Sequence, residues 1–223
     1  MGIVCLFLPT TPPAATGEIP IVKALAMLGD PNFLVFIVVS MAVTGLMQFY
    51  FLGTAQFLQD KGIGSEHVPG SMALAQIAQA VATWFLFMLL ITRLGYKRTL
   101  AIGALCWCLL YAVYVMGKPP ALLIAVQPFH GLAYVLFVIV GQKLVNDVSP
   151  EDIRSSMQAL IFAVTTGIGL FLGTQFAGFV MDTFTQDGAF QWQKVWLVPC
   201  LITLAGVLAL VFVFKEPAQS ESA

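Results

Sequence analysis

The chain has 223 residues, of which 59% are hydrophobic and only 9% are charged, and its mean hydropathy is +0.92. Soluble domains are about half apolar and about a quarter charged, so this composition argues against an ordinary soluble fold. Ten Lys and Arg residues against eleven Asp and Glu residues give a net charge of -1, which supplies no basic surface for a polyanion. No nucleic-acid partner is expected.

The few charged residues divide the sequence into six apolar runs, each close to the length of about 20 residues that a spanning helix needs. In chain order they cover residues 33–58, 71–92, 99–116, 121–142, 157–181 and 195–214. The runs are continuous rather than alternating, which is typical of spanning helices and not of a membrane β-barrel. We predict an all-α membrane protein with six transmembrane helices.

The predicted six-helix domain covers residues 33–214, between a segment of residues 1–32 and a tail of residues 215–223. The front segment begins with an apolar run that ends at Leu8, which is too short to span a bilayer and lacks the basic start of a signal peptide. We interpret this run as the last turns of a helix that begins upstream, followed by a cytoplasmic linker. A disordered or interfacial N-terminus is the alternative.

Two sequences predict helix starts. Asp30 before Pro31 provides an N-cap and a proline at the first helical position of the first span. Ser149 and Asp152, three residues apart, resemble a capping box and place the start of the fifth helix before its apolar part.

Basic residues in the short loops predict the orientation of the spans. With six spans, seven Lys and Arg residues share the side of both termini and three lie on the other side: Lys23, Arg93, Lys97, Arg98, Lys143, Arg154 and Lys215 against Lys61, Lys118 and Lys194. We expect an integral protein of the inner (plasma) membrane with both termini in the cytoplasm.

Three spans carry polar or aromatic side chains that recur at helical spacing, and in hydrocarbon such groups face protein or water. They are Thr44, Gln48 and Phe51 in the first span, Gln76, Gln79 and Thr83 in the second, and Gln127, His130, Tyr134 and Phe137 in the fourth. Hydrogen bonds between helices would explain one such stripe. Three favour a common polar cavity for a neutral, ring-containing solute.

Titratable groups are scarce inside the spans. His130 is the only plausible titratable group deep in a span. We interpret it as a packing residue rather than as a proton carrier. The acidic residues lie at span ends or in loops, which argues against a carboxylate relay or an acid-lined channel. We find no metal-ligand spacing and no nucleophile–base pair, so we expect no metal, no cofactor and no enzyme activity. Cys5, Cys106, Cys108 and Cys200 are interpreted as core or lipid-facing residues.

The fifth span contains a GxxxG sequence formed by Gly169 and Gly173. Small residues at this spacing allow helices to approach closely. We therefore expect a tight helix contact at this position.

The loop between the second and third spans, residues 92–98 (T-R-L-G-Y-K-R), resembles the signature loop of the major facilitator superfamily, whose pattern is roughly D-R-x-G-R-[RK]. Arg93, Gly95 and Lys97 match, and Arg98 is basic next to them, whereas Thr and Tyr replace the acidic residue and the first basic residue. The resemblance implies half of a twelve-helix bundle, built from two inverted three-helix repeats. It also implies that this loop acts as a conformational latch at the cytoplasmic surface.

Further stretches, in the same order along the chain, resemble the C-terminal half of the nucleoside:proton symporter family. They are Phe7-Leu8-Pro9, Gln48-Phe49-Tyr50, Gln76 to Gln79, His130-Gly131 followed by Tyr134, Gly141-Gln142, and residues 149–154 (S-P-E-D-I-R) leading to Gln158. The candidate substrate-binding residues are Gln48, Phe51, Gln76, Gln79, His130 and Tyr134.

The resemblance implies that Gln48 and Gln76 hydrogen-bond a nucleoside and that Tyr134 stacks on its base. An amide both donates and accepts, as ribose hydroxyls and base edges require, and an aromatic face can stack on any base. Gln79 stands where the family commonly has Glu, and Val135 stands where Asp often follows the aromatic residue. Transport could therefore be facilitated, coupled to protons through the missing half, or lost.

We expect a permease that carries a small organic solute, a nucleoside before a sugar or a drug, through a lipid bilayer by alternating access. One half supplies one wall of the cavity, so the partner is a missing N-terminal half or a second copy. The chain would be a fragment, a subunit of a split transporter or a homodimerising half. The rival interpretations are a membrane enzyme and a non-transporting six-helix membrane subunit.

Overall fold

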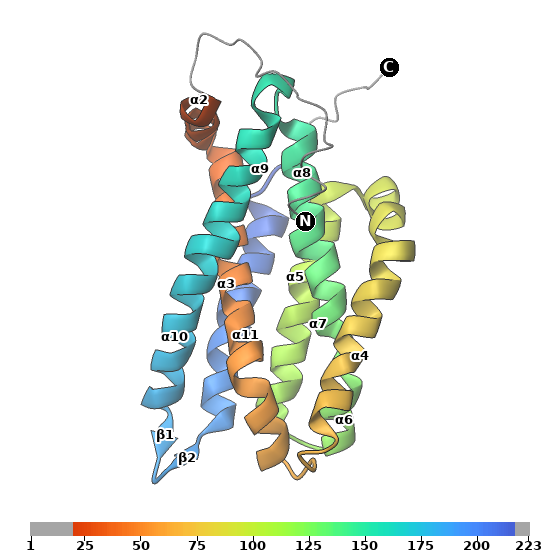
Figure 1. The fold of residues 1–223 in the computed structure, drawn as a ribbon, viewed down its shortest axis with the longest axis vertical. Helices are drawn as coiled ribbons and strands as arrows, with labels where there is room; N and C mark the ends of the chain where they lie inside the picture. The colour runs from red at the N-terminus through yellow and green to blue at the C-terminus, as the bar shows by residue number, and fades with distance from the viewer. Residues whose placement is uncertain (1–19, 217–223) are drawn as a thin grey trace, which may run out of the picture.

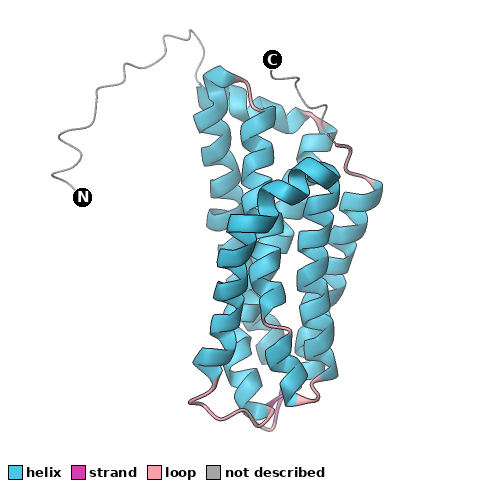
Figure 2. Cartoon of the chain, turned by 90° about the vertical axis from the view of Figure 1, so that its right-hand side faces the viewer, coloured by secondary structure: helices cyan, strands magenta, loops and turns pink. Residues whose placement is uncertain are grey.

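The computed structural model of the chain describes residues 20–216, and these residues form a bundle of long helices (Figure 1). Figure 2 shows that the loops gather at the two ends of the bundle. The predicted N-terminal helix remnant, which ends at Leu8, and most of the tail lie outside the described residues.

Five helices within this part of the chain are long and apolar enough to cross a membrane: Pro31–Asp60, Val68–Met116, Pro120–Val148, Glu151–Thr183 and Trp192–Phe212. The first is α3 (Pro31–Asp60) and the last is α11 (Trp192–Phe212). A short helix, α2 (Pro20–Ala26), and a 3₁₀ turn precede α3 within the segment expected to be a linker. A small hairpin of β1 (Thr185–Gln186) and β2 (Ala189–Phe190) precedes α11.

The three middle spans each contain a π-helical turn that interrupts the α-helix. The second consists of α4 (Val68–Val81), the π turn Ala82–Leu86 and α5 (Phe87–Met116). The third consists of α6 (Pro120–Ala125), α7 (Pro128–Ala133), the π turn Tyr134–Ile139 and α8 (Val140–Val148). The fourth consists of the 3₁₀ turn Glu151–Ile153, α9 (Arg154–Phe162), the π turn Ala163–Gly169 and α10 (Leu170–Thr183). Such turns are frequent at functional sites.

The second span reverses its direction at Gly95. Its 49 residues would measure about 73 Å as one straight helix, which is more than twice the hydrocarbon thickness of a bilayer. Gly95 has φ 77° and ψ 176°, which is not helical. In Figure 1 the chain rises along α4, turns at one end of the bundle and descends along α5.

The two predicted helix starts have different outcomes. The Asp30 side chain accepts a hydrogen bond from the Asn32 amide at 3.0 Å, with Pro31 at the first helical position, which confirms the first N-cap. The capping box at Ser149 and Asp152 is wrong, but the predicted early start of the fifth helix is confirmed, because helical residues begin at Glu151, before the apolar run that starts at residue 157. The Ser149 backbone is extended at the end of α8, and its hydroxyl donates to the Val145 carbonyl of that helix instead of accepting from an amide of the next one.

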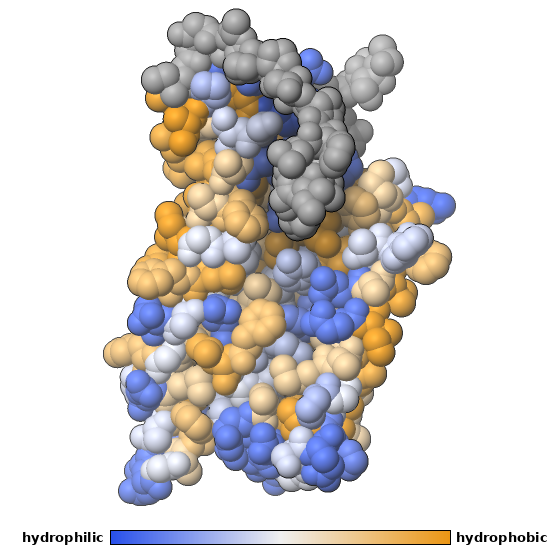
Figure 3. All heavy atoms as spheres, viewed as in Figure 1, coloured by the Kyte–Doolittle hydropathy of each residue, from blue (hydrophilic) through white to orange (hydrophobic). Residues whose placement is uncertain are grey.

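Helix α3 lies at the centre of the packing. Of the residues in its most apolar stretch 67% are buried, compared with 22% for Glu151–Thr183, and α3 packs against α10 and α11. The other large interface joins α5 to α11. On the face shown in Figure 3 apolar residues cover much of the surface, and hydrophilic residues interrupt them at mid-height and gather at the lower end.

The GxxxG sequence lies at the contact between α3 and α10. A Cβ added at Gly173 would meet the Gly45 carbonyl oxygen at 2.1 Å, and one added at Gly45 would meet the Gly169 carbonyl oxygen at 2.7 Å. The two backbones therefore touch directly, and the expected close helix contact is confirmed.

Candidate functional site

His130, on α7, lies in the centre of the bundle and is 2% exposed. Its ring stacks on Tyr50 of α3, with 3.7 Å between centroids and 13° between planes. The Trp107 indole on α5 donates to His130 Nδ1 at 3.1 Å, so the neutral imidazole carries its proton on Nε2. Helices α3, α5 and α7 are joined through this one side chain.

Gln127, three residues before His130, is fully buried and connects two tyrosines. Tyr50 donates its hydroxyl proton to Gln127 Oε1 at 2.8 Å, and Gln127 Nε2 donates to the Tyr114 hydroxyl at 2.7 Å. The same amide nitrogen donates to the Leu123 carbonyl at 2.9 Å, which belongs to the preceding helical turn. Tyr50 therefore links the Gln127 network to the His130 ring.

Gln48 is half-buried on α3, two residues before Tyr50. Its amide nitrogen donates to the Thr174 hydroxyl on α10, and Thr174 donates in turn to the Leu170 carbonyl at 2.8 Å. Gln48 thus joins two helices in the structure. Its amide oxygen is the group left to accept from a solute.

Gln76 is exposed and Gln79 is half-exposed on α4, the helix that packs against α7. The contact is close, because a Cβ at Gly131 would meet the Ala75 carbonyl oxygen at 1.9 Å and the Gln79 backbone nitrogen at 2.7 Å. The Thr83 hydroxyl donates back to the Gln79 carbonyl at 2.8 Å. The stripe on α4 therefore borders the His130 region and presents its amides to the surface.

The two predicted aromatic contacts differ in position. Phe51 is 51% exposed, and its ring meets His130 edge to face with 5.5 Å between centroids. Tyr134 is half-buried and begins the π turn one helical turn after His130. Phe51 and His130 are thus in direct contact, while Gln48, Gln76, Gln79 and Tyr134 lie on the helices around them.

The basic loop lies at the opposite end of the bundle from the β hairpin (Figure 1). Arg93 and Arg98 are exposed and Lys97 is half-buried. Gly95 has φ +77°, a left-handed backbone that strains any residue with a Cβ, so this turn favours glycine. The Tyr96 hydroxyl, at a position where the signature has a basic residue, donates to Asp147 on α8.

Tyr50 and Trp107 are partners of the candidate site that were not among the residues predicted from the sequence. Both are aromatic residues in apolar runs, where a core role is the default. The signal that could have found Tyr50 is its place in the Gln48-Phe49-Tyr50 stretch. Gln127 was in the fourth-span stripe but was not included among the candidate binding residues.

The profile of the family described as nucleoside H+ symporter matches residues 1–219. The chain belongs to this family. It is an integral membrane protein with several apolar helices of spanning length.

The curated relatives include two permeases of Escherichia coli (strain K12). Nucleoside permease NupG is 29% identical over 209 residues, which cover 86% of this chain and 49% of NupG. Xanthosine permease is 25% identical over 202 residues, which cover 86% of this chain and 48% of that protein. The chain therefore spans about half the length of the curated relatives it matches.

A solved structure gives the same fold. The crystal structure of a mutant of the nucleoside transporter NupG aligns with a TM-score of 0.81 at 24% identity, over 96% of this chain and 57% of that one. At this identity the similarity concerns the fold alone. The helical bundle described above is therefore one portion of a NupG-like fold.

Proposed function

We propose that this chain supplies one half of a membrane carrier for nucleosides. The observation that carries the proposal is membership of the nucleoside H+ symporter family over residues 1–219. The names of the relatives, a nucleoside permease and a xanthosine permease, favour nucleosides over sugars or drugs as the solute.

In this proposal the polar residues around His130 form one wall of the solute cavity. The Gln48 oxygen and the amide of Gln76 pair with ribose hydroxyls or base edges, and the ring of Tyr134 stacks on the base. Phe51 and Gln79 complete this wall beside His130. The exposure of Gln76 and Phe51 in the isolated half supports the assignment, because the opposite wall has to come from a second half.

We place six passes in this half, because the reversal at Gly95 lets Val68–Met116 cross the bilayer twice. The six passes form two inverted three-helix repeats, and two such halves rock about the solute to alternate its access. The missing N-terminal half supplies the second wall, and a second copy is the alternative. The basic loop lies on the cytoplasmic side of the inner (plasma) membrane, with both termini on that side.

Proton coupling would need groups elsewhere in the complete carrier. Gln79 is an amide and Val135 is a fully buried hydrocarbon side chain, so neither can carry a proton. Of the candidate site residues, only His130 belongs to a residue type that ordinarily gains a proton near neutral pH, and it is stacked and hydrogen-bonded in the core.

The test is uptake of radiolabelled uridine into proteoliposomes that contain the complete carrier. Gln48→Leu and Gln76→Leu should each raise the KM for uridine by about tenfold, the effect of losing one good hydrogen bond to the solute. Gln59→Leu is the matched control, because Gln59 is an exposed amide at the end of the same helix as Gln48 and its side chain bonds the Ala55 carbonyl of its own helix.

Two results would contradict the proposal. If unlabelled nucleosides fail to compete while a sugar or a drug does, the solute class is wrong. If both Gln→Leu variants bind uridine as the parent does, the assigned wall is wrong, and a non-transporting membrane subunit becomes the better interpretation.

A further inference from the structure

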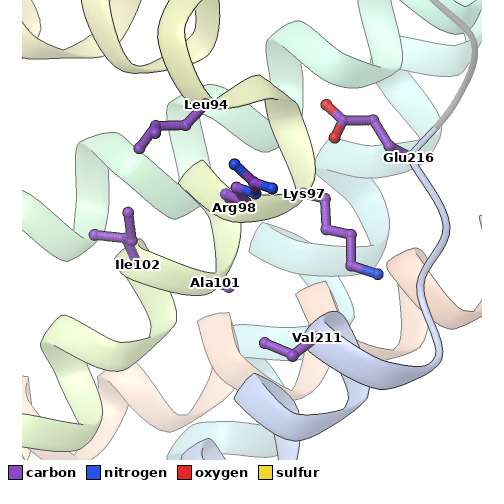
Figure 4. Close-up of a pocket in the computed structure, with 7 residues that line it drawn as sticks. All are labelled: Leu94, Lys97, Arg98, Ala101, Ile102, Val211 and Glu216. Carbon is purple, nitrogen blue, oxygen red and sulfur yellow. The ribbon is translucent and has the colours of Figure 1, made fainter.

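A groove of about 580 Å³ opens between the start of the descending part of α5 and the end of α11 (Figure 4). It is lined by Leu94, Lys97, Arg98, Ala101, Ile102, Val211 and Glu216. The groove therefore combines two cations with an apolar floor. The polar wall around His130 contributes no residue to it.

Both cations of the groove are without an ion pair among residues 20–216, where the ion pairs involve Lys23, His67 and Lys143. The one carboxylate of the groove, Glu216, accepts a hydrogen bond from the Tyr96 backbone amide instead of pairing with either cation. In Figure 4 the Glu216 carboxylate points toward the turn of α5, away from the Lys97 ammonium. The groove therefore carries two positive charges and one negative charge, and its net charge of +1 favours an anion.

The floor of the groove continues along the bundle as exposed apolar surface. Ile102 on α5 is followed at helical spacing by Leu105 and Leu109, which are 39% and 43% exposed. Val211 on α11 is preceded at the same spacing by Leu208 and Leu204, which are 48% and 39% exposed. These rows extend from the charged end of the bundle toward its middle, as a lipid acyl chain does.

The charged groups around the groove place it at the level of the lipid headgroups. Asp147, Lys143 and Asp152 lie at the same end of the bundle, where the neighbouring spans begin or end. Basic pockets between transmembrane helices at this level bind anionic headgroups, and each cation near the surface contributes about a fivefold gain in affinity.

We propose that the groove between α5 and α11 binds an anionic phospholipid, with its phosphate between Lys97 and Arg98 and an acyl chain along the leucine rows below. The carrier would hold this lipid at the basic loop, on the outer surface of the half. A zwitterionic lipid supplies no net negative charge and is the weaker ligand.

The complete protein, purified in detergent, would be titrated with dioleoyl phosphatidylglycerol and with dioleoyl phosphatidylcholine, and bound lipid counted by native mass spectrometry. The parent should bind phosphatidylglycerol more tightly. The double variant Lys97→Gln with Arg98→Gln should lose about thirtyfold in affinity for phosphatidylglycerol, and its affinity for phosphatidylcholine should remain unchanged.

The matched control is the double variant Arg93→Gln with Lys118→Gln, which removes two exposed cations that do not line the groove. This control should bind phosphatidylglycerol as the parent does, and unchanged elution on size exclusion would show that all variants are folded. Equal losses in both double variants would overturn the site and indicate only general charge attraction. Displacement of the lipid by millimolar inorganic phosphate would also overturn it, because the site would then bind free phosphate.

Discussion

The Gln127 side chain makes three buried hydrogen bonds. Its oxygen accepts from the Tyr50 hydroxyl, and its nitrogen donates to the Tyr114 hydroxyl and to the Leu123 carbonyl. Gln127→Leu would leave the Tyr50 and Tyr114 hydroxyls without this partner. A buried polar group that loses its partner costs about 1 to 3 kcal/mol of stability. We expect the unfolding temperature of the detergent-solubilised protein to fall by roughly 2 to 10 °C, measured by size exclusion after heating.

Gln59→Leu serves as the control for this prediction. Gln59 is exposed, and its amide nitrogen bonds the Ala55 carbonyl at 3.3 Å on the same helix. The same exchange of amide for alkyl should leave the unfolding temperature nearly unchanged there. Equal shifts in the two variants would show that the buried network does not stabilise the bundle.

The sequence is least informative about which individual side chains meet at the site. Helical spacing puts Gln127 and His130 on one face, and the structure places both in the core. Spacing along one helix cannot show which side chains of other helices meet that face. Tyr50 and Trp107 lie 80 and 23 residues from His130 in the sequence, and packing alone brings them to its ring.

At the scale of elements, the contact of α3 with α10 depends on glycine. Gly173→Ala would place a Cβ 2.1 Å from the Gly45 carbonyl oxygen, and a backbone atom cannot turn aside as a side chain does. We expect the two helices to separate, with a loss of about 1 to 3 kcal/mol and a lower unfolding temperature in the same heating assay.

Gly178→Ala is the matched control on the same helix, since a Cβ there meets nothing within 4 Å. Because alanine favours helix more than glycine, this variant should be as stable as the parent or slightly more stable. If Gly173→Ala unfolds at the same temperature as the parent, the close approach of α3 and α10 is not maintained in solution.

The elements themselves were largely predictable, because each apolar run between charges became helix. The predicted spans 33–58 and 99–116 lie within Pro31–Asp60 and α5, respectively. The π turns were not predictable, because nothing in the sequence pattern marks them: Ala82–Leu86, for example, continues the apolar run of its span without a glycine or a proline. The reversal at Gly95 could be inferred only from its charged neighbours and from the signature loop.

In the whole molecule, the proposed double crossing of Val68–Met116 determines which loops lie on the same side of the membrane. Single cysteines would be introduced at Ser65, Lys118, Asp187 and Glu151 after the native cysteines are replaced. We expect a membrane-impermeant maleimide to label the first three in intact cells and to label position 151 only after permeabilisation. A single crossing would instead place Ser65 and Lys118 on opposite sides, and labelling of only one of them would contradict the proposal.

The bond between the Trp107 indole and His130 Nδ1 has a consequence for any proton that reaches the centre of the bundle. A proton placed on Nδ1 would leave two N–H groups facing each other across 3.1 Å, and neither nitrogen could accept. Protonation of the imidazole therefore breaks the hydrogen bond from the Trp107 indole. The fluorescence of Trp107 would report the arrival of a proton at an imidazole whose ring contacts, Tyr50, Phe51 and Trp107, carry no carboxylate.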